Sequence, residues 1–154
     1  MARRLAIAAD HAGAALKAAI VARAGQVAPE WSVIDLGGDG SDPTDDYPDS
    51  ARAVAERMIA GHADRGLVIC GSGIGVTIAA NKFNGIRASI AHDPASARQG
   101  VVHDDMNVLA FGANLITVET ALETLAAFLD AQPSSEERYL RRTAKVADIE
   151  EEQS

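Results

Sequence analysis

The chain has 154 residues, a length typical of one domain that can bury most of its apolar surface in a single core. Its formal net charge of −8 at pH 7 argues against general affinity for nucleic acid or for anionic membranes. No apolar stretch approaches the roughly 20 residues that a membrane-spanning helix needs, and Asp10 and His11 interrupt the first apolar run too early for a signal peptide. We therefore expect one domain over residues 1–154 in a cytoplasmic protein.

Short apolar runs alternate with segments of helical period along the chain. The runs lack the in–out alternation of a half-exposed strand, so they predict strands that are buried on both faces. These strands are expected over residues 5–9, 32–36, 66–70, 88–91 and 107–111, with helices over 13–24, 48–61, 74–82, 94–101, 117–131 and 134–149. The alternation predicts an α/β protein with a three-layer Rossmann-like fold, in which helices cover both faces of a five-stranded parallel sheet.

Ligands of such a sheet bind beyond the carboxyl ends of its strands, so the residues that follow each strand are the candidates for chemistry. The first strand is followed by Asp10 and His11, the third ends at Cys70, and the fifth is followed by the segment 112–114 with Asn114 at its end. The loop 37–46 is rich in Gly, Asp, Ser and Pro, and we expect it to run over the surface near a site.

The segment 70–75, Cys-Gly-Ser-Gly-Ile-Gly, is the most informative part of the chain. Its alternating glycines favour a tight turn into a helix that exposes backbone amides to an anion. It has no Lys-Ser/Thr pair after the last glycine, so it is not a P-loop, and it does not follow the first strand, where a dinucleotide fingerprint normally lies. Cys70 is the single cysteine and cannot form an internal disulfide. It is either a buried structural thiol or a partly exposed catalytic thiol whose thiolate the nearby amides favour.

The histidines and acids leave further alternatives open. Asp10 and His11 either cap a loop or, at the mouth of the sheet, provide His11 to a phosphate. His103 fits a surface residue at a helix end and a catalytic residue equally well, whereas His62 and His92 are expected on the surface. No group of His, Cys, Asp and Glu has the spacing of metal ligands. We therefore expect neither a metal nor a cofactor.

The last predicted helix is basic in an otherwise acidic chain. Arg138, Arg141, Arg142 and Lys145 lie along it, and we expect the acids after Ser134 and Ser135 to mark its N-terminus. Such a basic run is either a solvated helix face or a binding site for an anion.

Taken together, these segments resemble the family of ribose-5-phosphate isomerase type B and the galactose-6-phosphate isomerase subunits. The similar segments cover nearly the whole chain and comprise Asp10-His11-Ala12-Gly13, Asp46-Tyr47-Pro48, residues 70–75, 79–82 and 85–88, His103 and residues 107–112. The resemblance implies a homodimer, or further a tetramer, whose active sites lie across the interface and receive the C-terminal helix of the other subunit.

The resemblance also implies a cofactor-independent isomerisation of ribose 5-phosphate to ribulose 5-phosphate through an enediolate. In this interpretation Cys70 is the base, Ser72 passes the hydroxyl proton, and the backbone of Gly71, Gly73, Ile74 and Gly75 holds the developing charge. The remaining roles are ring opening by Asp10 and His103, the sugar pocket at Tyr47, and phosphate binding by His11, Arg138 and Arg142.

Two residues depart from the family pattern at positions expected to bind substrate. Asn114 stands where an arginine usually helps to bind phosphate, and Asp104 stands where an asparagine usually contacts the sugar. A carboxylate cannot donate a hydrogen bond as an amide can. Another aldose phosphate, such as a tetrose, allose or galactose phosphate, is therefore the near alternative to ribose 5-phosphate. A non-catalytic module that binds sugar phosphates is the alternative of a different class.

Overall fold

The computed structural model describes residues 2–154 as an α/β fold built on one sheet. Its elements are β1 (Arg3–Ala9), α1 (Ala14–Val27), β2 (Trp31–Asp35), α2 (Tyr47–Ile59), β3 (Arg65–Cys70), α3 (Ile74–Ala80), β4 (Ala88–Ile90), α4 (Pro94–Asp104), β5 (Val108–Gly112), α5 (Val118–Asp130) and α6 (Glu137–Glu152). All strand pairs are parallel, in the order β2-β1-β3-β5-β4. The predicted fold class is confirmed. Among the described residues, no helix combines the length and the apolar character that crossing a membrane requires.

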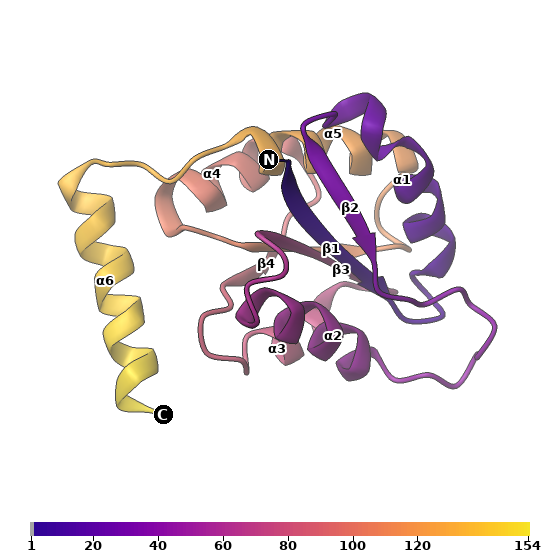
Figure 1. Ribbon diagram of the computed structural model, residues 1–154, viewed down its shortest axis with the longest axis horizontal. Coiled ribbons are helices and arrows are strands. Elements are labelled where there is room, and N and C mark those ends of the chain that lie inside the picture. The colour runs from indigo at the N-terminus through magenta and orange to yellow at the C-terminus, as the bar shows by residue number, and fades with distance from the viewer. Residues whose placement is uncertain (1) are drawn as a thin grey trace.

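The sheet is the middle of three layers (Figure 1). Helices α1, α4 and α5 cover one face, where Ile7, Leu109 and Phe111 are fully buried. Helices α2 and α3 cover the other face, whose core is built largely from alanine and valine. Every residue of β3 and β5 is buried. Burial on both faces explains why these strands appear in the sequence as continuous apolar runs.

The last helix begins later than the sequence predicts. The expected helix over residues 134–149 is observed as α6, and its N-cap is Glu136 with no side-chain cap. Ser134 is not the cap: its backbone N–H donates to the Val102 carbonyl (2.9 Å) and its Oγ accepts from the Glu136 N–H (3.1 Å). The first bond ties residue 134 to the last turns of α4, and α6 begins three residues later than predicted.

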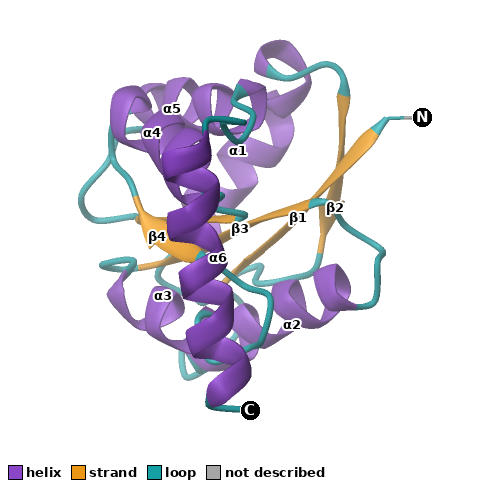
Figure 2. Cartoon of the chain, turned by 90° about the vertical axis from the view of Figure 1, so that its left-hand side faces the viewer, coloured by secondary structure: helices purple, strands orange, loops and turns teal. Residues whose placement is uncertain are grey.

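Helix α6 lies apart from the three layers, beside β4 and α4 (Figures 1 and 2). None of its residues is buried, and Leu140, Val146 and Ile149 are exposed. Near its C-terminal end the Glu150 carboxylate accepts from the Gly85 N–H at 3.0 Å. A groove of about 1160 Å³ separates α6 from β4 and α4. The apolar face of α6 therefore has no cover within the described chain.

Candidate active site

The strand order reverses direction between β1 and β3, because β2 lies beyond β1 and β5 lies beyond β3. The carboxyl ends of β1 and β3 meet at this switch point, where doubly wound sheets bind ligands. The Asp10 N–H donates to the Ile69 carbonyl (3.2 Å), which places Asp10 directly beside the end of β3. Asp10 is buried, and its Oδ1 accepts from the Gly13 N–H at 3.1 Å. The carboxylate therefore caps its loop and lies at the switch point at the same time.

Cys70 lies at the end of β3 and begins a turn in which two side chains accept hydrogen bonds from backbone amides. The Gly73 N–H donates to the Cys70 Sγ (3.2 Å), and the Ile74 N–H donates to the Ser72 Oγ (3.2 Å). Gly73 has a φ of +80°, which favours glycine. Cys70 is 5% exposed, so the partly exposed cysteine that the sequence offered as one alternative is not observed. The Gly73 N–H thus fixes the position of the sulfur at the carboxyl end of β3.

Tyr47 and Asn114 frame this turn from two other elements. The Tyr47 ring lies so close to Gly75 that a Cβ at Gly75 would be 2.6 Å from the Tyr47 Cε1. Glycine is thus required where the tyrosine packs on α3. The Asn114 N–H donates to the Gly71 carbonyl (3.1 Å), and the Asn114 side chain is exposed. Both predicted substrate contacts therefore lie around the turn that carries Cys70.

His11 is held at the same edge by a residue that the sequence analysis did not identify. The Asp45 Oδ1 accepts from the His11 N–H at 2.8 Å and is 2.7 Å from the His11 Nδ1. The hydrogen bond to Asp45 is the main cause that raises the pKa of His11 above its usual value; burial opposes it and the nearby Asp10 carboxylate adds to it. The acidic composition of the loop 37–46 was the available signal, but it did not single out Asp45.

His92 was expected on the surface and is instead part of this region. It is half-buried after β4, and its Nε2 accepts from the Gly112 N–H at 2.9 Å. Gly112 packs on Ser72, because a Cβ at Gly112 would be 2.5 Å from the Ser72 backbone. His92 therefore supports the end of β5 against the turn of Cys70.

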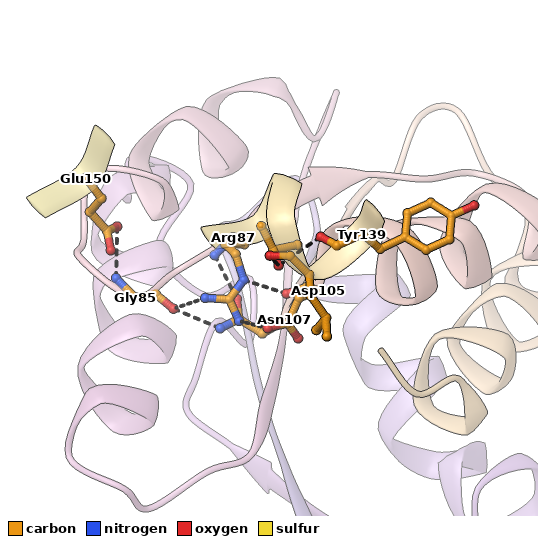
Figure 3. Close-up of polar contacts among 8 residues, drawn as sticks. Gly85, Arg87, Asp105, Asn107, Tyr139 and Glu150 are labelled. Atoms are coloured by element: carbon orange, nitrogen blue, oxygen red, sulfur yellow. Dashed lines mark hydrogen bonds and ion pairs between the residues drawn. The ribbon is translucent and has the colours of Figure 1, made fainter. Parts of the chain in front are cut away.

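A second group of predicted residues lies at the opposite edge of the sheet. Helix α4 returns from the carboxyl ends of the strands, so His103 and Asp104 in its last turn lie near the amino ends. Asp105 caps α4 with a φ of +53°, and Arg87 holds it there (Figure 3). The Arg87 Nε donates to the Asp105 carbonyl and its Nη2 donates to the Asp105 Oδ2, at 2.5 and 3.1 Å. Arg87 thereby holds Asp105 at the end of α4.

Tyr139 joins this second group to α6 and was also missed by the sequence analysis. Its ring stacks on the His103 ring, with centroids 4.3 Å apart and planes 10° from parallel. The guanidinium carbons of Arg138 and Arg142 lie 4.6 and 5.9 Å from the Tyr139 centroid. The signal available in the sequence was that Tyr139 is an aromatic residue within the basic run of the last helix. His103 and the two arginines therefore form one cluster around Tyr139.

The structure does not bring the two groups together within one chain. Strand β5 has five residues between the amino edge and the carboxyl edge, which at about 3.3 Å per residue separates the edges by about 16 Å. Cys70, Ser72, Asp10, His11, Tyr47 and Asn114 lie at the carboxyl edge, whereas His103, Asp104, Arg138 and Arg142 lie beyond the amino edge. Among residues 2–154, no group of three or more His, Cys, Asp or Glu side chains is arranged to hold a metal ion.

Comparison with known proteins identifies the family of this chain. The model of the family described as Ribose/Galactose Isomerase matches residues 5–146. Ribose-5-phosphate isomerase B of Escherichia coli is 41% identical over 97% of both chains, and D-erythrulose-4-phosphate isomerase 2 of Mycolicibacterium smegmatis is 40% identical over 97% of this chain and 96% of its own. The solved structure of ribose-5-phosphate isomerase B from Mycoplasma genitalium with bound ribulose-5-phosphate is 34% identical, covers 99% of both chains and has a TM-score of 0.89. The chain is therefore an isomerase that belongs to the ribose/galactose isomerase family.

Proposed function

We propose that this protein interconverts ribose 5-phosphate and ribulose 5-phosphate through an enediolate, with Cys70 as the base. The observation that carries this proposal is the position of the Cys70 sulfur at the switch point of the sheet, where the Gly73 N–H donates to it at 3.2 Å. The named activities of the similar E. coli and M. genitalium proteins support ribose 5-phosphate as the substrate.

The proposed reaction moves one proton between neighbouring carbons. Asp10 and His103 open the furanose ring to the free aldehyde. The Cys70 thiolate then takes the proton from C2, the electron pair of that C–H bond forms the C1–C2 double bond, and the carbonyl oxygen becomes the enediolate oxygen. Backbone amides of the turn 71–75 stabilise this charge. Ser72 passes the proton of the C2 hydroxyl to the oxygen on C1, and the Cys70 thiol returns its proton to C1.

The separation of the two groups supports a site that is shared between two subunits. The interface of a two-fold dimer is reciprocal. The carboxyl edge of each subunit can therefore lie against the α6 cluster of the other subunit. His103, Asp104, Arg138 and Arg142 of one subunit then complete the site around Cys70 of the other. The uncovered apolar face of α6 and the groove beside β4 support this homodimer. Assembly of two dimers into a tetramer is the further alternative.

The activity is tested with the purified protein and a panel of four-, five- and six-carbon aldose phosphates. Formation of ketose is followed without added metal or cofactor. We expect the highest kcat/KM for ribose 5-phosphate. Turnover of no member of the panel would contradict the proposed substrate class, and binding without turnover would favour the non-catalytic module.

A four-carbon sugar phosphate is the second candidate substrate. The similar M. smegmatis protein is named a D-erythrulose-4-phosphate isomerase, and Asp104 and Asn114 are the two departures at expected substrate contacts. A shorter sugar requires fewer contacts to its hydroxyl groups, so loss of the usual asparagine at position 104 is compatible with it. A kcat/KM for erythrose 4-phosphate or erythrulose 4-phosphate above that for ribose 5-phosphate would favour this candidate.

A further inference from the structure

The carboxyl edge of the sheet is poor in positive charge. The segments that follow the five strands, 10–13, 36–46, 71–73, 91–93 and 113–117, contain no lysine or arginine. Lys17 in α1 is 5% exposed and pairs with Asp35 at 2.6 Å. Two histidines remain, and His92 uses its Nε2 as an acceptor for the Gly112 N–H. His11 is thus the residue of these segments that is free to carry positive charge toward an anion.

Asp45 controls how His11 can serve an anion. One carboxylate oxygen of Asp45 contacts both the backbone N–H and the ring Nδ1 of His11, at 2.8 and 2.7 Å. The two contacts fix the ring and leave Nε2 as the nitrogen available to a ligand. Because Nδ1 carries a proton to donate to a carboxylate, Nε2 of the neutral ring has a lone pair and repels an anion. Nε2 becomes a donor when the ring takes its second proton.

We propose that Asp45 is a positioning residue for phosphate recognition, which holds His11 so that Nε2 meets the substrate phosphate and the affinity for phosphate follows the charge of the His11 ring. This inference rests on the proposed function, from which the phosphorylated substrate is taken. Asp45 itself does not touch the phosphate. Its effect is to keep a cation at an edge where Asp10, Asp42 and Asp45 would otherwise repel an anion.

The pH dependence of phosphate binding follows from the direction in which the pKa of His11 is shifted. The described charged groups that act on His11 are Asp45 and Asp42 of the loop and Asp10 of its own segment. Asp45, as the main cause, and Asp10 hold the pKa of His11 above its usual value. The phosphate-binding form is therefore fully present at low pH and is lost as the pH rises through the raised pKa. Removing the charge of Asp45 moves this loss to lower pH.

Asp45→Asn tests the inference with little change of shape, because an amide oxygen can still accept from the His11 N–H. Asp42→Asn is the matched control: it removes a charge from the same loop, and the bonds of Asp42 go to Thr44 and not to His11. The first measurement is an NMR titration of the His11 ring in the free protein, with its resonances assigned through His11→Gln. We expect the pKa of His11 to fall clearly in Asp45→Asn and much less in Asp42→Asn.

The second measurement is KM for the aldose phosphate as a function of pH. The ratio of KM in Asp45→Asn to KM in the wild type should be near one in the acidic range and rise several-fold toward neutral and mildly alkaline pH. The change should fall on KM rather than on kcat. Titration of the phosphate group itself cancels in this ratio, and a ratio that is independent of pH would overturn the inference.

Inorganic phosphate separates this inference from the proposed function. At mildly acidic pH it should shift the His11 ring resonances of the wild type, and near neutral pH it should bind Asp45→Asn more weakly. If these results hold while no aldose phosphate is turned over, the proposed function fails and the role of Asp45 stands. If His11 titrates identically in wild type and Asp45→Asn, the role of Asp45 is refuted whatever the activity.

Discussion

At the scale of single residues, Cys70 combines two properties that the sequence left as alternatives. It is buried among the core residues between the sheet and α2 and α3, and its sulfur also accepts from the Gly73 N–H. The Gly73 N–H fixes the position of this sulfur at the strand end, where doubly wound sheets bind ligands. Burial alone therefore does not argue against catalysis at this position.

Cys70→Ala should abolish isomerisation and leave the affinity for a phosphorylated product analogue within several-fold, because the thiol moves a proton and does not bind phosphate. Loss of the buried sulfur should cost about 1 kcal/mol of stability, so a thermal melt confirms that the variant is folded. Cys70→Ser, which keeps the size and a hydrogen-bond acceptor, should be inactive as well. Turnover near the wild-type rate in either variant would show that Cys70 is not the base.

Asn114→Arg tests the departure from the family pattern at position 114. The exposed Asn114 follows β5 at the edge that lacks lysine and arginine, and a guanidinium there can bind phosphate through two nitrogens. We expect a lower KM for ribose 5-phosphate, and Asn114→Gln should leave KM close to the wild-type value. A higher KM in Asn114→Arg would indicate a pocket formed for a different ligand, and ribose 5-phosphate would then be the first assignment to abandon.

At the scale of elements, the loop that carries Asp45 is anchored where α1 meets the end of β2. Lys17 Nζ donates to the Asp35 Oδ1 (2.6 Å), and the Gly37 N–H donates to the same oxygen (3.0 Å). Burial by itself would raise the pKa of Asp35, but these two hydrogen bonds and the charge of Lys17 outweigh it and lower the pKa. The start of the loop is therefore held by an ion pair whose strength depends on pH.

Lys17→Met should destabilise the protein by about 1 kcal/mol at neutral pH, a value discounted because solvent reaches the Asp35 side chain, which is 42% exposed. The lowered pKa of Asp35 means that its contribution is present above the unfolded-state pKa and is lost as the pH falls through the folded-state pKa. The difference in thermal stability between wild type and variant should thus shrink in acid.

Arg98→Met, which breaks the exposed pair of Arg98 and Asp130, is the control and should change stability by less than about 0.5 kcal/mol. A Lys17→Met effect that is equally small, or that grows in acid, would show that the ion pair does not anchor the loop.

At the scale of the whole molecule, the sheet lies between two groups that the proposed reaction needs together. The edge with Cys70 and Asp10 and the cluster of His103 with the α6 arginines belong to opposite ends of β5. No rotation of a side chain can close that distance. A second subunit is the simplest way to join them.

Mixing two inactive variants tests whether a second subunit completes each active site. Cys70→Ala is defective at the carboxyl edge, and Arg138→Ala/Arg142→Ala is defective at the α6 cluster. In a mixed dimer with shared sites, one site receives both intact halves. Random re-association of equal amounts makes half of the dimers mixed, so activity should recover to roughly a quarter of the wild type.

The structure predicts the outcome of the mixing experiment for two further pairs of variants. His103→Ala should also complement Cys70→Ala, because His103 lies in the α6 cluster. Asp10→Ala should not complement Cys70→Ala, because both defects lie at the same edge and every mixed site keeps one of them. Absence of rescue by the cross-edge pairs, once mass analysis shows that mixed dimers formed, would refute the shared site.

The sequence by itself determined the fold class and the carboxyl-edge group. Central strands buried on both faces must be apolar throughout, and the carboxyl ends of parallel strands must share one edge. These two rules are enough to place Asp10, His11, Cys70 and Asn114 at one edge of the sheet.

The tertiary structure alone decided which side chains meet across elements. Asp45 and His11 are 34 residues apart, and no periodic pattern selects one acid of a loop with several. The Ser134 N–H bond to Val102, which delays α6, is equally non-local. The separation of His103 from Cys70 follows from the direction in which α4 crosses the sheet. These outcomes depend on packing between distant segments, which local sequence patterns do not encode.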